Sequence, residues 1–175
     1  IDLRLESPFD DSGFDEGFDN GFDDGFDEFE DEADGGVDED AYWFTSDKMQ
    51  NIIEIHDYLD GLPETGKVLS LGTMIKLAHE LNGNEALDSI ELAVLYSQIP
   101  EEYKITLLTP YVSVENDQVR FSIRVRESDP DLVRGNLLFN IREGLKREFG
   151  LQDEQIHLTG MLVLYNNMLQ SLFDS

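Results

Sequence analysis

An acidic repeat near the N-terminus limits how this chain can fold more than any other feature. Residues 1–40 contain 18 Asp or Glu and a single basic residue, Arg4, so they carry −17 of the total charge of −27. Within them, Gly-Phe-Asp followed by Glu, Asn or Asp repeats four times between residues 13 and 28. A Gly at every fourth position and dense like charge disfavour both helix and sheet. We therefore expect residues 8–40 to form a mostly disordered acidic loop.

The composition also bears on partners and chemistry. A charge of −27 repels the phosphates of nucleic acid, so we expect no nucleic-acid partner, and an anionic membrane surface is disfavoured for the same reason. The sequence has no cysteine, which excludes disulfides, thiolate metal sites and cysteine nucleophiles. No run of about 18 apolar residues, the length that spans a bilayer, occurs in it.

From Tyr42 onward the pattern is that of a globular α+β domain. The clearest strand is predicted at 118–126, where apolar residues alternate with Arg and Ser at the period of a strand. A long amphipathic helix is predicted at 131–149. The remaining predicted elements are strands at 1–6, 67–71 and 155–159, and helices at 46–59, 73–81, 86–98, 101–109 and from 161 onward.

The order of these elements predicts a fold. If the acidic loop at 8–40 and a helical insertion at about 73–110 are set aside, two β-α-β units remain. This is the order of the ferredoxin-like split βαβ fold (βαβ-βαβ), with four strands and two helices on one face. The predicted organisation is thus a first strand within residues 1–7, the acidic loop, and the rest of the domain in residues 41–175.

No combination of residues indicates catalysis. The three histidines are far apart in sequence, and His79-Glu80 begins a zinc-protease string in which Gly83 replaces the second zinc-binding His. A nucleophile elbow, a phosphate-binding loop and a dinucleotide fingerprint are also missing. We interpret His56, His79 and His157 as ordinary core-edge or surface residues. We expect the protein not to be an enzyme and to need no cofactor.

One alternative concerns calcium. Glu30, Glu32 and Asp34 match positions one, three and five of an EF-hand loop, but Ala41 stands at position twelve, where such a loop has its bidentate Glu. These three carboxylates are therefore weak calcium candidates at most. We favour a solvated loop without a functional metal.

The basic residues are also unevenly distributed. Seven of the 12 lie between residues 120 and 147, namely Arg120, Arg124, Arg126, Arg134, Arg142, Lys146 and Arg147. One hypothesis is that the acidic loop docks on a patch formed by these residues. The interpretation that we favour is an ordinarily charged strand face and helix surface.

Several strings carry a resemblance to a known family. They include Tyr-Trp-Phe-Thr-Ser-Asp-Lys-Met at 42–49, His-Asp-Tyr-Leu-Asp-Gly-Leu-Pro at 56–63, Pro-Tyr-Val-Ser at 110–113 and Leu-Thr-Gly-Met at 158–161. Their order and spacing resemble periplasmic loops of exporters of the resistance-nodulation-division (RND) superfamily. The nearest branch is the one grouped with the mycobacterial membrane protein large (MMPL) proteins. The resemblance covers about 130 residues and does not include the acidic repeat.

This resemblance implies a role in transport. It implies a porter domain on the periplasmic side of the cell inner membrane, joined to transmembrane helices of the same polypeptide in a proton-driven exporter. The pattern is interrupted at Ile1 and at Ser175, as expected for a domain cut from a longer protein whose last helix continues into the membrane. In this family the proton-carrying residues lie in the transmembrane helices. The domain itself would then be non-catalytic and provide substrate access.

The resemblance also implies a cargo and an assembly. The cargo would be hydrophobic or amphipathic, as in efflux or lipid transport, and a homo-oligomer is one candidate for the assembly of the full transporter. Met74, Leu77, Tyr96 and Tyr111 are candidates to line the cargo path, although a place in the core is the interpretation that we favour for them. The alternative function is a stand-alone ferredoxin-like binding or regulatory domain with an acidic segment for which calcium is a weak candidate ligand.

Overall fold

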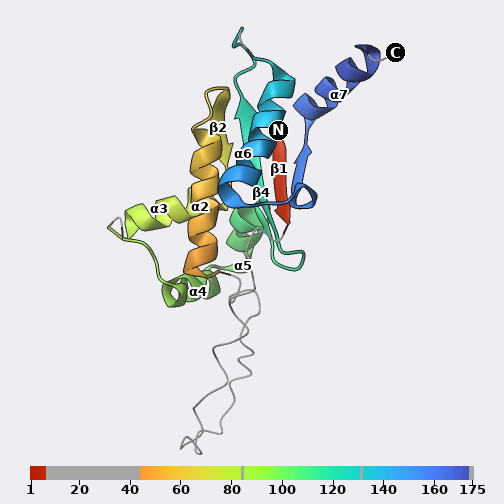
Figure 1. Ribbon diagram of the computed structural model, residues 1–175. Helices are drawn as coiled ribbons and strands as arrows, with labels where there is room; N and C mark the ends of the chain where they lie inside the picture. The colour runs from red at the N-terminus through yellow and green to blue at the C-terminus, as the bar shows by residue number, and fades with distance from the viewer. Residues whose placement is uncertain (7–43, 84, 131, 174–175) are drawn as a thin grey trace, which may run out of the picture.

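The computed structural model describes residues 1–6, 44–83, 85–130 and 132–173. These residues form an α+β structure in which helices pack on an antiparallel sheet (Figure 1), as the sequence predicted at this coarse level. The prediction for residues 8–40 lies outside the described residues.

The sheet consists of β1 (Asp2–Glu6), β2 (Thr65–Leu69), β3 (Val112–Ser113), β4 (Gln118–Val125) and β5 (Ile156–Thr159). The strand order is β2-β4-β1-β5, β3 pairs with β4, and all pairings are antiparallel. β4 therefore lies between β1 and β2, and β1 lies between β4 and β5. The connection from β1 to β2 therefore passes over β4, and the connection from β4 to β5 passes over β1.

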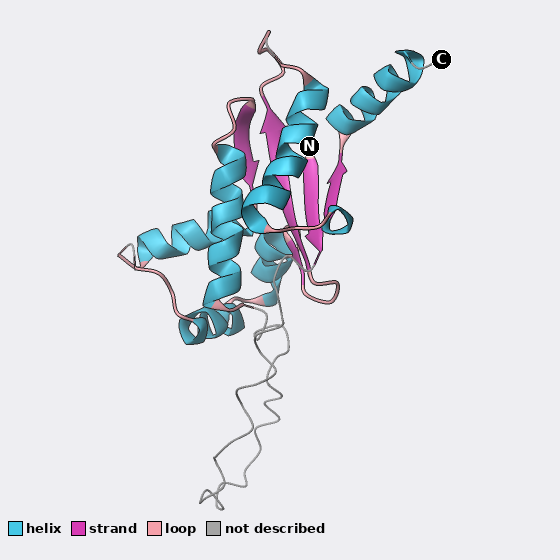
Figure 2. Cartoon of the chain, in the orientation of Figure 1, coloured by secondary structure: helices cyan, strands magenta, loops and turns pink. Residues whose placement is uncertain are grey.

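Alternation along the strands gives the sheet one apolar and one polar face. Leu3 of β1 lies opposite Phe121 of β4, Leu5 lies opposite Val119, and all four side chains are buried. Two helices cover this face, α2 (Ser46–Asp60) and α6 (Arg134–Phe149), and Figure 2 shows both in front of the sheet. The polar face carries the charged residues of the same strands.

The two helices on the apolar face come very close to each other at one point. The Tyr58 hydroxyl of α2 donates a hydrogen bond to the carbonyl oxygen of Asn140 in α6, at 3.1 Å, and its ring packs edge-on against Phe149. A Cβ atom at Gly144 would lie 1.7 Å from the Tyr58 hydroxyl oxygen. Glycine at position 144 is therefore what allows Tyr58 to fit between the helices.

A helical insertion separates β2 from β3. It contains α3 (Leu71–Leu81), α4 (Ser89–Gln98), the short α5 (Glu101–Tyr103) and the π-helix η2 (Lys104–Leu108). α3 and α4 project to one side of α2 (Figure 1), and α3 also contacts β4. The Ser89 hydroxyl accepts a hydrogen bond from the backbone N–H of Ser46, at 3.0 Å, which joins the start of α4 to the start of α2.

Several predicted boundaries differ from the structure for local reasons. β2 ends and α3 begins earlier than predicted because Ser70 caps α3: its hydroxyl accepts from the Gly72 N–H at 3.1 Å. The third helix was predicted from residue 86 but begins at Ser89, since Asp88 is its N-cap. The helix predicted from 131 begins at Arg134. The two-residue strand β3 was not predicted.

The last helix, α7 (Met161–Phe173), extends away from the body (Figure 1). Leu162 is its buried residue, whereas seven large apolar side chains are exposed, namely Met161, Leu164, Tyr165, Met168, Leu169, Leu172 and Phe173. Within the described ranges, no helix has both the length and the apolar character needed to cross a membrane.

Candidate functional site: an apolar cavity in the helical insertion

A cavity of about 220 Å³ lies within the helical insertion and is lined by apolar side chains alone. Its walls come from the start of α2, from α3 and α4, and from η2. The lining residues are Phe44, Met49, Leu71, Met74, Ile75, Leu77, Ala78, Leu81, Leu92, Leu95, Tyr96, Ile99, Leu107 and Leu108.

Two helical faces build most of this lining. In α3 the lining residues recur at the spacing of one helix face, from Leu71 through Ile75 and Ala78. In α4 they follow the same period, from Leu92 through Tyr96 to Ile99. The apolar faces of α3 and α4 both border the cavity, and the side chains of these two faces do not fill it.

The lining is open to solvent at one side. Leu77 is 52% exposed and Leu81 is 82% exposed, while Ile75 and Leu92 at the inner side are buried. An apolar surface left open in this way is typical of a ligand or partner site rather than of a closed core. The site therefore has the chemistry to bind an apolar group by desolvation.

An aromatic pair separates the cavity from a polar hollow. The rings of Phe44 and Tyr96 are stacked with their centres 4.4 Å apart, and both residues line the cavity and the hollow of about 540 Å³ beside it. The Lys104 ammonium lies 4.2 Å from the centre of the Tyr96 ring and 2.9 Å from Glu101. A single cation is thus fixed at the boundary between the apolar cavity and the polar hollow.

The π-helix also contributes to the cavity. η2 provides two adjacent lining residues, Leu107 and Leu108. Short π-helical turns occur frequently at functional sites.

Three of the four candidate cargo-lining residues meet at this cavity. Met74 and Leu77 from α3 and Tyr96 from α4 all line it. Tyr111 does not, because it precedes β3 and lines a separate polar hollow with Arg4. The contribution of η2 was not predictable, since the pattern that indicates a helix at 101–109 does not show which side of it faces α3.

The three histidines lie on three different elements, α2, α3 and β5, and His56 forms a buried pair with Ser70. Its Nδ1 atom lies 2.8 Å from the Ser70 hydroxyl oxygen, and both residues are buried. The same hydroxyl oxygen accepts a hydrogen bond from the Gly72 N–H at 3.1 Å. The pair joins α2 to the start of α3.

The environment of His56 favours the neutral ring. Burial lowers the pKa of His56 below its ordinary value, the positive charge of Lys76 lowers it further, and the carboxylates of Asp57 and Asp60 act in the opposite direction. The unfolded chain therefore binds a proton at this residue at a higher pH than the folded chain does. The stability that His56 contributes is present above its ordinary pKa and is lost as the pH falls below that value.

This sign gives a testable pH dependence. We expect the free energy of unfolding to fall more steeply for the unaltered protein than for His56→Gln when the pH is lowered from about 7.5 to about 5.5. Urea denaturation at a series of pH values would measure both slopes. His79→Gln is the control, because it leaves the buried ring in place and should retain the steep slope. Parallel slopes for His56→Gln and the unaltered protein would refute this assignment.

The weak calcium candidates Glu30, Glu32 and Asp34 lie outside the described residues. Across residues 1–6, 44–83, 85–130 and 132–173, no group of three or more His, Asp or Glu side chains is placed to hold a metal ion.

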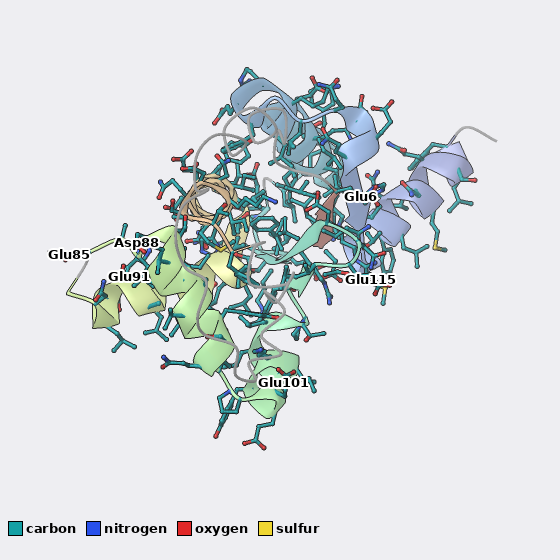
Figure 3. The ribbon with its side chains drawn as sticks, turned by 90° about the horizontal axis from the view of Figure 1, so that it is seen from below. Glu6, Glu85, Asp88, Glu91, Glu101 and Glu115 are labelled. Carbon is teal, nitrogen blue, oxygen red and sulfur yellow. The ribbon has the colours of Figure 1, made fainter. Side chains whose placement is uncertain are left out.

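The acidic side chains labelled in Figure 3 do not gather at one point. Glu6, Glu101 and Glu115 lie well apart from one another in Figure 3. Asp88 and Glu91 form a capping box at α4, in which the Glu91 N–H donates to Asp88 at 2.7 Å and the Asp88 N–H donates to Glu91 at 2.9 Å.

The basic residues concentrated in the sequence divide between two sides of the sheet. Arg120 and Arg124 lie on the polar face of β4. Arg142 and Lys146 belong to α6, on the apolar side, and both contact Asp153, at 3.0 and 2.9 Å. Hydrogen bonds from Lys146 and then Arg142 lower the pKa of Asp153 below its ordinary value. The single patch of the docking hypothesis is therefore not formed.

Comparison with known proteins names no relative for this site. No protein family, no curated protein and no solved structure matches the chain. The cavity is accordingly interpreted from its own chemistry.

Proposed function

We propose that this chain is a porter domain of a proton-driven exporter and that the cavity in its helical insertion receives the apolar part of a hydrophobic or amphipathic cargo. The observation that carries the proposal is the wholly apolar, one-sided lining of that cavity. The resemblance of the strings at 42–49, 56–63 and 158–161 to RND-superfamily loops supports the exporter class.

The arrangement of strands supports the fold that this proposal requires. In a ferredoxin-like split βαβ fold, each β-α-β unit receives a strand of the other unit between its own two strands. The order β2-β4-β1-β5, with antiparallel pairing throughout, agrees with that pattern. The proposal therefore includes a ferredoxin-like porter fold with a helical insertion.

The size of the cavity limits what it would bind. An apolar cavity of ~150 Å³ in another protein holds benzene, and drug-sized ligands occupy roughly 300–1,000 Å³. A cavity of about 220 Å³ thus suits one ring or a short alkyl branch of a larger cargo. The rest of the cargo would lie at the open side, beside the exposed Leu77 and Leu81.

Filling the cavity tests the binding step. We expect the uncharged fluorescent probe N-phenylnaphthylamine to bind the unaltered protein, and Ala78→Trp to weaken this binding at least ~10-fold, because the indole would occupy the space. Ala78 lines the cavity, whereas Ala86 is exposed in the connection before α4 and does not. Ala86→Trp is therefore the matched control and should bind as the unaltered protein does.

Two outcomes would count against the cavity. One is an unaltered protein that leaves the probe fluorescence unchanged. The other is an Ala78→Trp protein that folds, as judged by circular dichroism, and still binds the probe with unaltered affinity.

The exporter class has a separate test in the gene that encodes the chain. A porter domain requires several apolar segments of about 20 residues elsewhere in the same polypeptide. A complete gene without such segments would overturn the exporter proposal and would favour the stand-alone binding domain instead. The cavity measurement would keep its meaning in either case.

A further inference from the structure

The polar face of the sheet is basic although the chain as a whole is strongly acidic. Arg4 of β1 lies directly opposite Arg120 of β4 on one side and His157 of β5 on the other, and Lys67 of β2 lies directly opposite Arg124. We call Arg4, Lys67, Arg120 and Arg124 the basic sheet face.

Two carboxylates on this face are already engaged. Asp2 accepts from Arg120 at 2.8 Å, and Glu6 accepts from His157 at 3.0 Å and from Gln118 at 2.9 Å. Within the described residues, both β1 carboxylates on this face are therefore already bound by other side chains.

Three cations of the basic sheet face are without a partner. Arg4, Lys67 and Arg124 are exposed, and none of their side chains has a hydrogen bond or an ion pair with another residue in the part of the chain that the structure describes. Like charges directly opposite each other across strands destabilise a sheet. The pairs Arg4–Arg120 and Lys67–Arg124 therefore carry a cost that an anionic occupant would remove.

The basic sheet face also contains two hollows in which a ligand group could lie. A polar hollow of about 290 Å³ is lined by Arg4 and Arg120 together with Ser113, Asn116 and Gln118. A second hollow, of about 320 Å³, is lined by Lys67 and Arg124 together with Leu69, Ser122 and Ile123. Guanidinium groups beside amide and hydroxyl groups are the donors that carboxylates accept best.

We propose that the basic sheet face binds carboxylates of the acidic segment 8–40 of the same chain. Charge complementarity favours this occupant, because residues 7–43 contain 16 Asp or Glu and no Lys or Arg. The segment also leaves the sheet immediately after Glu6, two residues beyond Arg4 on the same strand. This proposal is independent of the cargo function proposed above.

The tether makes the contact geometrically feasible. The 37 residues between Glu6 and Phe44 can span up to roughly 120 Å when extended. Gln118 and Arg124, which bracket the basic sheet face along β4, are about 20 Å apart by strand geometry. A tethered segment of this kind acts at an effective concentration in the ~mM range without a second molecule.

Zero-length cross-linking of the intact chain tests the proposal. A carbodiimide joins a Lys amine to a carboxylate that touches it, and Lys67 is the lysine of the basic sheet face. We expect mass spectrometry of the digested monomer to find links from Lys67 to residues 8–40 several-fold more often than links from Lys146, which lies on α6. Raising the salt from 0.1 to 1 M shortens the screening length from ~10 to ~3 Å and should abolish the preference.

Matched variants exclude a general charge effect. Arg4→Gln/Arg124→Gln should lower the Lys67 links at least ~5-fold, whereas Arg134→Gln/Arg147→Gln removes the same charge from α6 and should leave them unchanged. Equal links from Lys67 and Lys146, or a Lys67 yield that both double variants reduce alike, would overturn the proposal. Links found only in covalent dimers would also overturn it, in favour of the segment of a second copy.

Discussion

Replacing Phe121 with alanine is expected to lower the free energy of unfolding by about 3–5 kcal/mol. Phe121 is fully buried at the middle of β4, where it lies opposite Leu3 and beneath the two covering helices. Removing its ring would leave a cavity that the neighbouring side chains fill only in part. Since small domains unfold at about 5–15 kcal/mol, a loss of this size would remove a large part of the stability. Urea denaturation followed by circular dichroism would measure it.

Phe139→Ala is the control for this loss. Phe139 lies on α6 and is 63% exposed, so the same truncation there removes little buried area. A change within about 0.5 kcal/mol is expected. Equal losses at positions 121 and 139 would show that the core is not where the structure places it.

Gly144→Ala is expected to destabilise the protein by about 1–3 kcal/mol, although alanine is the better helix former. The added methyl group would overlap the Tyr58 hydroxyl and ring, so α2 and α6 would have to separate or Tyr58 would have to leave its site. Thermal and urea unfolding would measure the loss.

A second glycine of the same helix provides the control. At Gly135 the nearest atom to an added Cβ is the side-chain oxygen of Asn166 at 3.4 Å, an ordinary contact. Gly135→Ala should therefore be neutral or stabilising by up to about 1 kcal/mol. In a Tyr58→Ala background the cost of Gly144→Ala should disappear, and a cost that persists there would contradict the proposed clash.

The sequence predicted the core elements well because the spacing of their apolar residues follows which side of each element is buried. The alternation from Gln118 onward matches β4, and the apolar positions of the 46–59 helix are the ones that α2 buries, from Met49 to Leu59. Such patterns arise wherever one side of an element packs and the other is hydrated. The α+β class followed from the order of these elements.

Features that depend on contacts between distant residues were not predictable. The cavity requires that the face of α3 ending at Leu81 meet the face of α4 beginning at Leu92, and neither period specifies the angle between the helices. The pairing of His56 with Ser70 also joins two elements. The basic residues are close together in the sequence, but Arg124 and Lys146 lie on opposite sides of the sheet. Arg124 belongs to the polar face of β4, whereas Lys146 belongs to α6, which covers the apolar face.

The helical insertion has a mechanical consequence for whatever it binds. α4 buries a single residue of its own, Leu92, whereas α2 buries six, so α4 would open and close at a lower free-energy cost than the sheet and its covering helices. An occupant of the cavity that binds only the closed form would add RT ln(1 + [L]/Kd) to that cost. Binding in the cavity would then make local opening of α4 rarer without changing the sheet. This would be detected as slower amide hydrogen exchange in α4.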